Sequence, residues 1–200
     1  SNKDVMEENS NKNAYIASTQ RDLIAGEVSK DLTKRLLLPE NIVKAHEEGA
    51  IHFHDMDYFV QTIFNCCLIN IKDMFENGTV MNGKLIESPK SFQVACTVMT
   101  QIISAVASSQ YGGQSVDIRH LGKYLRYSRE KYRAKYEEQY GGKMDPYIIN
   151  QLISDRVKDE LRSGVQTIQY QINTLMTTNG QSPFVTLFMY LDDNDEYVEE

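Results

Sequence analysis

The sequence predicts an α/β fold that is predominantly helical. Three long stretches with helical periodicity lie between residues 89 and 178, and two short apolar segments, within residues 51–71 and 183–191, have the composition of strands. A long helical crossover between strands is typical of an α/β barrel, and two strands are too few for an independent sheet. We therefore predict that these 200 residues form one part of a barrel.

The composition indicates a globular protein of a reducing cytoplasm. Hydrophobic residues make up 41% of the chain, which is enough for a core, and no apolar run approaches the roughly 20 residues of a membrane span. The net charge of −7 argues against a DNA-binding protein, because such proteins are usually basic. The three cysteines lack CxxC spacing, so neither a disulfide framework nor a zinc knuckle is expected.

Two helices are expected near the N-terminus, after a polar and flexible lead-in over residues 1–14. The first follows Ser18 or Thr19, and apolar residues recur along it every four positions. Its predicted buried stripe consists of Ile24, Val28, Leu32 and Leu36. Pro39 ends this helix and opens a shorter one, which Gly49 ends.

Reactive side chains gather between Ile51 and Ile71. Apolar and polar residues alternate at the start of this stretch, which favours an extended segment, whereas Phe64–Ile71 is too short for periodicity to separate strand from helix. On a strand, His52 and His54 would share one face at roughly 7 Å, a spacing that can bridge a metal in a hydrolase. Such a site needs further ligands, and the other histidines lie in no ligand-like context. We therefore predict that these groups form hydrogen bonds to the backbone and to neighbouring strands and hold no metal.

Two adjacent cysteines follow in the same stretch. Judged on the residues alone, a free cysteine in an apolar run most often packs as a small hydrophobic residue. On a strand, neighbouring side chains point to opposite faces, so at most one of the two cysteines faces a given site. In that geometry Cys66 shares a face with Phe64 and Leu68, and Cys67 shares the other face with Asn65.

Glycine, proline and asparagine divide the rest of the chain. Asn77-Gly78 and Asn82-Gly83 predict turns and a small hairpin. Three helices are expected, from Ser88-Pro89 to Gly112-Gly113, from about Asp117 to Gln139, and from Asp145-Pro146 to about Thr178 with a bend at Gly164. Gly112-Gly113 fits no phosphate-loop pattern and is interpreted as a helix terminator. Residues 183–191 are expected to form a buried strand.

The second of these helices carries tyrosines among cations. They are Tyr124, Tyr127, Tyr132, Tyr136 and Tyr140, among Arg126, Arg129, Lys131, Arg133 and Lys135. Aromatic residues interleaved with cations can stack bases and hold phosphates. The alternative is a helix–helix interface whose cations extend to solvent, and we favour it.

Several stretches resemble the anaerobic (class III) ribonucleotide reductases, which are glycyl-radical enzymes. They are ENSNK and TQRDLIAG between residues 8 and 26, HFHD-D at His52–Asp57, NC at Asn65–Cys66, and NGQSPFVT at residues 179–186. In this order they extend over nearly the whole chain. The resemblance implies that residues 1–200 are the N-terminal part of the catalytic domain, a partial fragment of the ten-stranded α/β barrel of glycyl-radical enzymes.

The resemblance also implies an oxygen-sensitive enzyme that converts ribonucleoside triphosphates to deoxyribonucleotides for DNA synthesis. Cys66 matches a catalytic cysteine that faces the substrate on the first barrel strand, and Asn65 is implied to bind the substrate. No cofactor is expected within these residues. The glycyl radical, a structural zinc and the cysteine that forms a thiyl radical are expected beyond Glu200, with formate as the reductant, so the isolated chain should be inactive.

Regulation and partners follow from the same resemblance. Glu87, Lys90 and Gln101 match effector-binding positions, where a deoxynucleotide or ATP selects the substrate, and the helices of residues 89–178 would pair across a homodimer. A radical-SAM enzyme would install the glycyl radical, and neither DNA nor a membrane is an expected partner. Two alternatives stay open, namely a regulatory or dimerisation module without turnover and, with less support, an HxH metal-dependent hydrolase.

Overall fold

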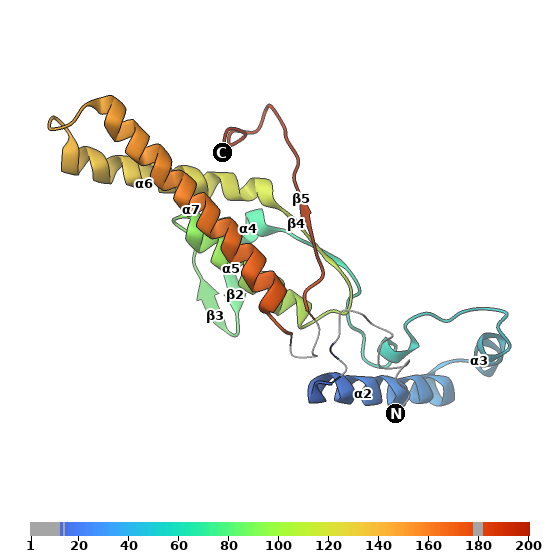
Figure 1. Ribbon diagram of the computed structural model, residues 1–200. Coiled ribbons are helices and arrows are strands. Elements are labelled where there is room, and N and C mark those ends of the chain that lie inside the picture. The colour runs from blue at the N-terminus through green and yellow to red at the C-terminus, as the bar shows by residue number, and fades with distance from the viewer. Residues whose placement is uncertain (1–12, 14, 178–181) are drawn as a thin grey trace.

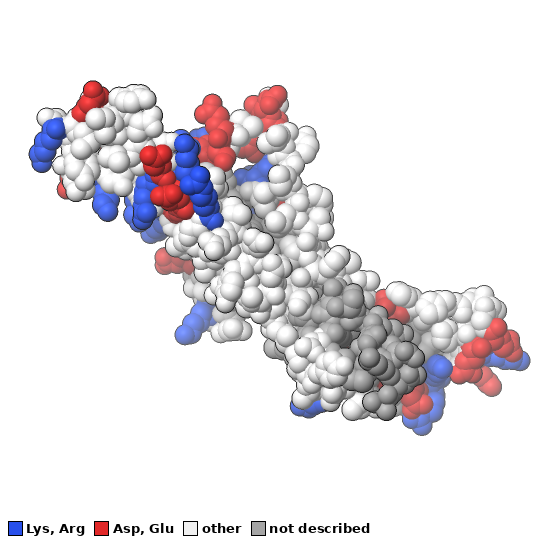
Figure 2. Space-filling model, in the orientation of Figure 1, with Lys and Arg blue, Asp and Glu red and all other residues white. Residues whose placement is uncertain are grey.

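The computed structural model describes residue 13, residues 15–177 and residues 182–200. Apart from residue 13, the predicted lead-in lies outside the described residues, as do residues 179–181 of the NGQSPFVT motif. The molecule is elongated, with residues 17–47 at one end and the tip of a long helical hairpin at the other (Figure 1). Charged side chains gather toward the ends, and the middle of the visible face carries few (Figure 2). Within the described ranges, no helix has the length and hydropathy to span a bilayer.

Three short parallel strands form the main sheet in the order β1-β4-β5. They are β1 (Cys67–Ile69), β4 (Gln114–Asp117) and β5 (Val185–Phe188). Leu68, Ser115 and Thr186 are neighbours in the register. For this sheet the sequence predicted only two strands and missed β4, because QSVD is too short and too polar to separate from the start of the next helix. The side chains of β5 are mostly exposed, so the predicted burial of that strand is wrong within the described residues.

Three long helices supply most of the core, which also includes Ile69 of β1 and Val116 of β4. They are α5 (Phe92–Ala107), α6 (Gly122–Tyr140) and α7 (Pro146–Thr174). All three were predicted, but α5 begins after Ser91, whose hydroxyl accepts the Val94 amide, and not at Pro89. The start of α7 is confirmed, since Asp145 caps it with Pro146 at the first helical position.

The carboxylate of Glu160 on α7 joins all three helices. Its Oε1 accepts hydrogen bonds from the backbone N–H of Gln93 at 3.0 Å and from the Ser128 hydroxyl at 2.9 Å. Its Oε2 accepts a hydrogen bond from the Tyr132 hydroxyl at 2.7 Å. Ser128 Oγ in turn accepts a hydrogen bond from the backbone N–H of Phe92 at 2.9 Å. The first amides of α5 therefore have acceptors, and the negative charge lies at the positive end of the helix dipole.

Gly164 allows α5 and α7 to approach closely. A Cβ at this position would lie 2.4 Å from the Phe92 ring and 2.9 Å from Cys96 Sγ. The helix α7 continues through Gly164, and the glycine provides room for its neighbours.

The two N-terminal helices form as predicted, but their predicted buried stripe is wrong. The elements are α2 (Ala17–Leu32), a π-helical turn (Thr33–Leu37) and α3 (Glu40–Glu47). Ile24, Val28 and Leu36 are 66%, 53% and 73% exposed. Thr33 is buried instead, and its hydroxyl donates to the backbone oxygen of Met56 at 3.2 Å.

A short helix and a hairpin connect β1 to α5. They are α4 (Ile71–Glu76), β2 (Thr79–Met81) and β3 (Lys84–Ile86), while single 3₁₀ turns lie at Met56–Tyr58 and Ile118–Leu121. Asn82 and Gly83 have φ values of 50° and 75°, which a tight hairpin turn requires, so the predicted hairpin is confirmed. The stretch from Phe64 to Ile71, which periodicity left open, contains both a strand and the start of a helix.

Gly164→Ala is expected to destabilise the chain by about 1–3 kcal/mol, because the added methyl group would push α7 away from Phe92 and Cys96. Urea unfolding followed by circular dichroism measures the change. Ser163→Ala is the matched control, since Ser163 is exposed on the same helix and alanine favours helix. An unchanged unfolding midpoint for Gly164→Ala would contradict the close packing described here.

Candidate active site

A β-bulge lies where β1 and β4 begin. Phe64 pairs with Gln110, and Cys67 pairs with Gln114. Between these two pairs one side of the ladder advances three residues (64 to 67) and the other four (110 to 114). The mismatch interrupts regular pairing, so Asn65–Cys66 lie outside the strand.

Gly112 lies in contact with Asn65 at this bulge. A Cβ at Gly112 would be 2.1 Å from both the backbone oxygen and Oδ1 of Asn65. The adjacent Tyr111 amide donates to the Phe64 oxygen at 3.2 Å, which holds the two backbones together. The glycine is therefore required by a close backbone approach. It does not terminate a helix, as the sequence had suggested, because α5 already ends at Ala107.

Cys66 is exposed at this edge of the sheet, and its Sγ donates to Asn65 Oδ1 at 3.2 Å. A regular strand would have placed these two side chains on opposite faces, and they meet because both precede β1. Phe64 and Leu68, which flank the pair in sequence, are 77% and 79% exposed. The structure thus brings the predicted catalytic residue and the predicted substrate-binding residue together.

The other two cysteines face the core. Cys67 is half-buried against it, and burial raises the pKa of its thiol. Cys96 is fully buried, and burial, with a smaller contribution from Glu160, raises its pKa to about 12. Because the thiolate is the reactive form of cysteine, neither is a good nucleophile at neutral pH.

Residues 51–60 form a loop and not the predicted extended segment. Asp55 has a φ of 52°, a left-handed conformation that is uncommon for a residue other than glycine. His54 Nε2 lies 3.2 Å from Asp55 Oδ1, and His54 Nδ1 lies 3.4 Å from His52 Nε2. The described polar contacts of His54 therefore lie within the motif, and not with the backbone or neighbouring strands as predicted.

Tyr111 connects this loop to the sheet. Its hydroxyl donates to Asp55, and its ring stacks on Tyr58 with 4.1 Å between centroids and 9° between planes. Burial, followed by the hydrogen bond from Tyr111 to Asp55, raises the pKa of Tyr111 to about 12. Sequence reasoning missed this contact, because Asp55 and Tyr111 are 56 positions apart. The only signal was the group of polar residues around Gly112.

The geometry offers no support for the HxH hydrolase. Among the residues that the structure describes, no group of three or more His, Cys, Asp or Glu side chains could hold a metal ion. His120 lies 3.9 Å from Asp117 at the other end of β4, away from the HxHD loop. That the chain holds no metal stays a prediction.

The predicted effector-binding residues are accessible. Glu87 and Lys90 are exposed between β3 and α5, and Gln101 is exposed on α5 itself. Their exposure leaves room for a ligand, and their role stays a prediction.

The tyrosines of α6 support the helix-interface interpretation. Tyr132, Tyr136 and Tyr140 pack against the core. Tyr124 is buried edge-on to Phe75, with 5.1 Å between the ring centroids. Tyr124 is therefore not available to stack bases, whereas Tyr132, Tyr136 and Tyr140 are partly buried and Tyr127 is 37% exposed.

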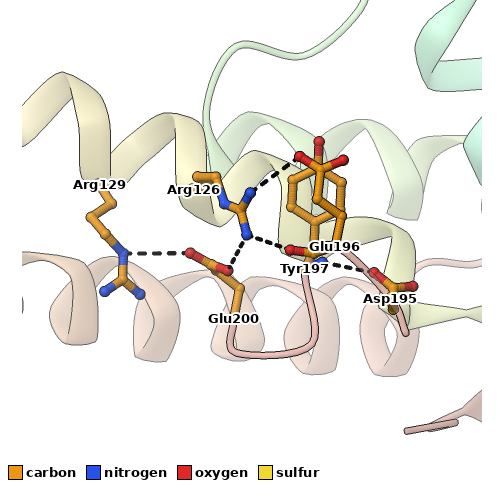
Figure 3. Close-up of polar contacts among 6 residues, drawn as sticks. All are labelled: Arg126, Arg129, Asp195, Glu196, Tyr197 and Glu200. Carbon is orange, nitrogen blue, oxygen red and sulfur yellow. Dashed lines mark hydrogen bonds and ion pairs between the residues drawn. The ribbon is translucent and has the colours of Figure 1, made fainter. Parts of the chain in front are cut away.

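The neighbouring arginines hold the C-terminal segment against α6 (Figure 3). Arg126 lies 3.2 Å from carboxylate oxygens of both Glu196 and Glu200, and its guanidinium lies 4.4 Å from the centre of the Tyr197 ring. Arg129 lies 3.6 Å from Glu200. These two cations thus serve an intramolecular contact and are not free phosphate-binding groups.

Parallel strands joined by helical crossovers, with reactive groups at the strand ends, place the chain in the class of α/β proteins. The family model for anaerobic ribonucleoside-triphosphate reductase matches residues 8–200, and the chain belongs to this family.

Individual relatives agree with the family. The anaerobic ribonucleoside-triphosphate reductase of Enterobacteria phage T4 is 42% identical over 187 residues, which are 93% of this chain and 30% of the relative. The Escherichia coli K12 enzyme of the same name is 40% identical over 188 residues, which are 92% of this chain and 26% of the relative. The chain therefore spans less than a third of the length of these relatives.

A solved structure confirms the predicted fold. The anaerobic ribonucleotide reductase from Thermotoga maritima, crystallised with dATP and CTP, superposes with a TM-score of 0.58 and 13% identity, over 86% of this chain and 26% of that one. At this identity the likeness shows the fold alone.

Alkylation is expected to distinguish the three cysteines. Iodoacetamide at about pH 8 should modify exposed Cys66 first, Cys67 more slowly, and Cys96 only after unfolding, because burial raises the pKa of the latter two thiols. Peptide mass spectrometry measures the three rates, and Cys66→Ser should remove the fastest phase. Equal rates for Cys66 and Cys96 in the folded protein would contradict this placement.

Proposed function

We propose that the chain is the N-terminal part of the catalytic domain of an anaerobic ribonucleoside-triphosphate reductase, which replaces the ribose 2′-hydroxyl of its substrate by hydrogen. The observation that carries the proposal is the exposed thiol of Cys66, held by Asn65 at the bulged edge of the sheet. The names of the relatives support the reaction. The two nucleotides named for the Thermotoga maritima structure support a nucleotide substrate.

Cys66 acts in the redox half of the proposed reaction. Its thiol needs an open approach to the ribose, and the exposed position outside β1 supports this. The Asn65 side chain accepts the thiol hydrogen, and its amide N–H groups are able to donate to a ribose hydroxyl. Cys67, which is turned toward the core, supports β1 and takes no part in the chemistry.

The rest of the proposed machinery lies outside these residues. A glycyl radical, installed by a radical-SAM enzyme, would generate the thiyl radical that abstracts the 3′-hydrogen, with formate as the reductant. A structural zinc is proposed for the same remaining part of a full-length enzyme. The residues described here would position the substrate and supply one thiol.

Glu87, Lys90 and Gln101 are proposed to bind a deoxynucleotide or ATP effector at a homodimer interface. Their exposure beside and along α5 supports an accessible site. Exposed apolar side chains on α7, among them Tyr147 at 69% and Ile148 at 48%, support contact with a second subunit through residues 89–178.

In a full-length reductase that contains this chain, Cys66→Ser is expected to abolish nucleotide reduction, because a hydroxyl cannot replace the redox chemistry of a thiol. Deoxynucleotide formation is measured by chromatography, and glycyl-radical content by electron paramagnetic resonance, which should be unchanged. Cys67→Ser is the matched control and should keep most of the activity. Full turnover by the Cys66→Ser enzyme would mean that this cysteine only packs, and the assignment of the site would fall.

A further inference from the structure

The connection between α5 and β4 is held by the buried side chain of Gln110, which is 3% exposed. Its Nε2 donates hydrogen bonds to the Gly112 oxygen at 3.1 Å and to the Gly113 oxygen at 3.3 Å. A side-chain amide nitrogen carries two hydrogens, so a single group serves both carbonyl oxygens. These two contacts fix the path of the backbone over residues 110–113.

The two glycines whose oxygens accept these hydrogen bonds also contact the candidate site. A Cβ at Gly112 would lie 2.1 Å from Asn65 Oδ1, which is the oxygen that accepts the Cys66 thiol. The Gly113 oxygen accepts a further hydrogen bond from the backbone N–H of Cys67 at 3.1 Å. Each glycine therefore touches a residue adjacent to Cys66 in the sequence, and a shift of either glycine would displace that neighbour.

Side-chain packing alone does not hold this connection in place. A cavity of about 470 Å³ lies beside it, and Gln110 lines this cavity together with Phe64, Cys66 and Cys67. An empty space offers no atoms for the connection to pack against, so hydrogen bonds determine where the backbone lies on this side. Without the hydrogen bonds of Gln110, the connection would be free to move into the cavity and away from Asn65.

We propose that Gln110 is a positioning residue for the reaction at Cys66. It fixes the Gly112 backbone against Asn65, and this contact holds the Asn65 side chain with Oδ1 directed at the Cys66 thiol. In that orientation the N–H groups of the Asn65 amide are left for a ribose hydroxyl. The inference rests on the proposed function, since that function makes Cys66 the reacting thiol. Gln110 acts through the backbone that it holds.

The competing interpretation is that Gln110 supports only the fold, as any buried side chain does. Gln110→Met separates the two roles, because methionine has a similar length and volume but no hydrogen to donate. Gln114→Met is the matched control. Gln114 is also buried, at 1% exposed, but its Nε2 donates to the Ile103 oxygen of α5 at 3.1 Å. Both variants lose a buried glutamine, and only the first releases Gly112.

The first test uses the chain itself and needs no activity. The S–H stretching band in the infrared moves to lower frequency when a thiol donates a hydrogen bond, and the difference spectrum against Cys66→Ser isolates the band of Cys66. Gln110→Met should move this band to higher frequency, as Asn65→Leu should by removing the acceptor outright. Gln114→Met should leave the band in place. An unchanged Cys66 band in Gln110→Met would overturn the proposal.

A second variant separates the hydrogen bonds of Gln110 from its packing within one sample. Gln110→Glu keeps the shape of the side chain, and its carboxyl group is able to donate a hydrogen bond only when it is protonated. Burial raises the pKa of a carboxyl group, so the Cys66 band of this variant should return toward its original frequency as the pH falls from about 8 to about 5. The Gln110→Met band should not change with pH. A Gln110→Glu band that also ignores pH would overturn the role of the hydrogen bonds, whether or not Gln110→Met folds.

The third test uses the full-length enzyme. Gln110→Met should lower kcat by on the order of 10-fold, with KM and glycyl-radical content nearly unchanged, because a misplaced thiol slows the chemical step. Gln114→Met is again the control and should keep most of the activity. Normal kcat in Gln110→Met would show that the residue supports only the fold and would overturn its positioning role. If the unsubstituted enzyme reduced no ribonucleotide, the proposed function would fail, and the infrared tests would still decide whether Gln110 sets the contact between Asn65 and Cys66.

Discussion

The arrangement of the three helices depends on the carboxylate of Glu160, which is partly buried between them. It accepts an amide hydrogen from the start of α5 and hydroxyl hydrogens from Ser128 and Tyr132 of α6. Hydrogen bonds to a charged acceptor contribute about 1.5–3 kcal/mol each, and removing the acceptor would leave several donors unsatisfied. The helix α5 leads from this junction toward the bulge at Gln110. Its placement therefore also sets the position of the amino-terminal ends of β1 and β4.

The amino-terminal ends of β1 and β4 are shaped by backbone geometry more than by side-chain packing. An unequal number of residues in the two strands releases Asn65–Cys66 from regular pairing, and Gly112 lets Asn65 approach the facing backbone. The same connection carries Tyr111, which ties the HxHD loop to the sheet. Reactive groups thus lie on irregular segments that a rigid scaffold of strands and helices holds in place.

Sequence patterns a few residues long predicted the features that depend on interactions between neighbouring residues. The Asp145-Pro146 cap of α7 and the Asn82-Gly83 turn are encoded within a few residues, and both are present. The strand β4 could not be predicted, because its polar residues become a strand only by pairing with segments far along the chain. Resemblance identified the family and singled out Cys66, but the contact of Cys66 with Asn65 depends on a bulge that no local pattern marks. The apolar stripe of α2 was predicted to be buried and is exposed. Periodicity predicts that a helix has an apolar face, but it does not predict what covers that face.

The central claim is that substrate meets the chain at the bulged edge beside Cys66. A crystal structure of a full-length reductase containing this chain, with a ribonucleoside triphosphate bound, tests it most directly through the distance from Cys66 Sγ to the ribose. We predict that the ribose lies in van der Waals contact with Cys66 Sγ and within hydrogen-bonding distance of the Asn65 side chain. A ribose bound elsewhere, with Cys66 facing only protein or solvent, would contradict the account.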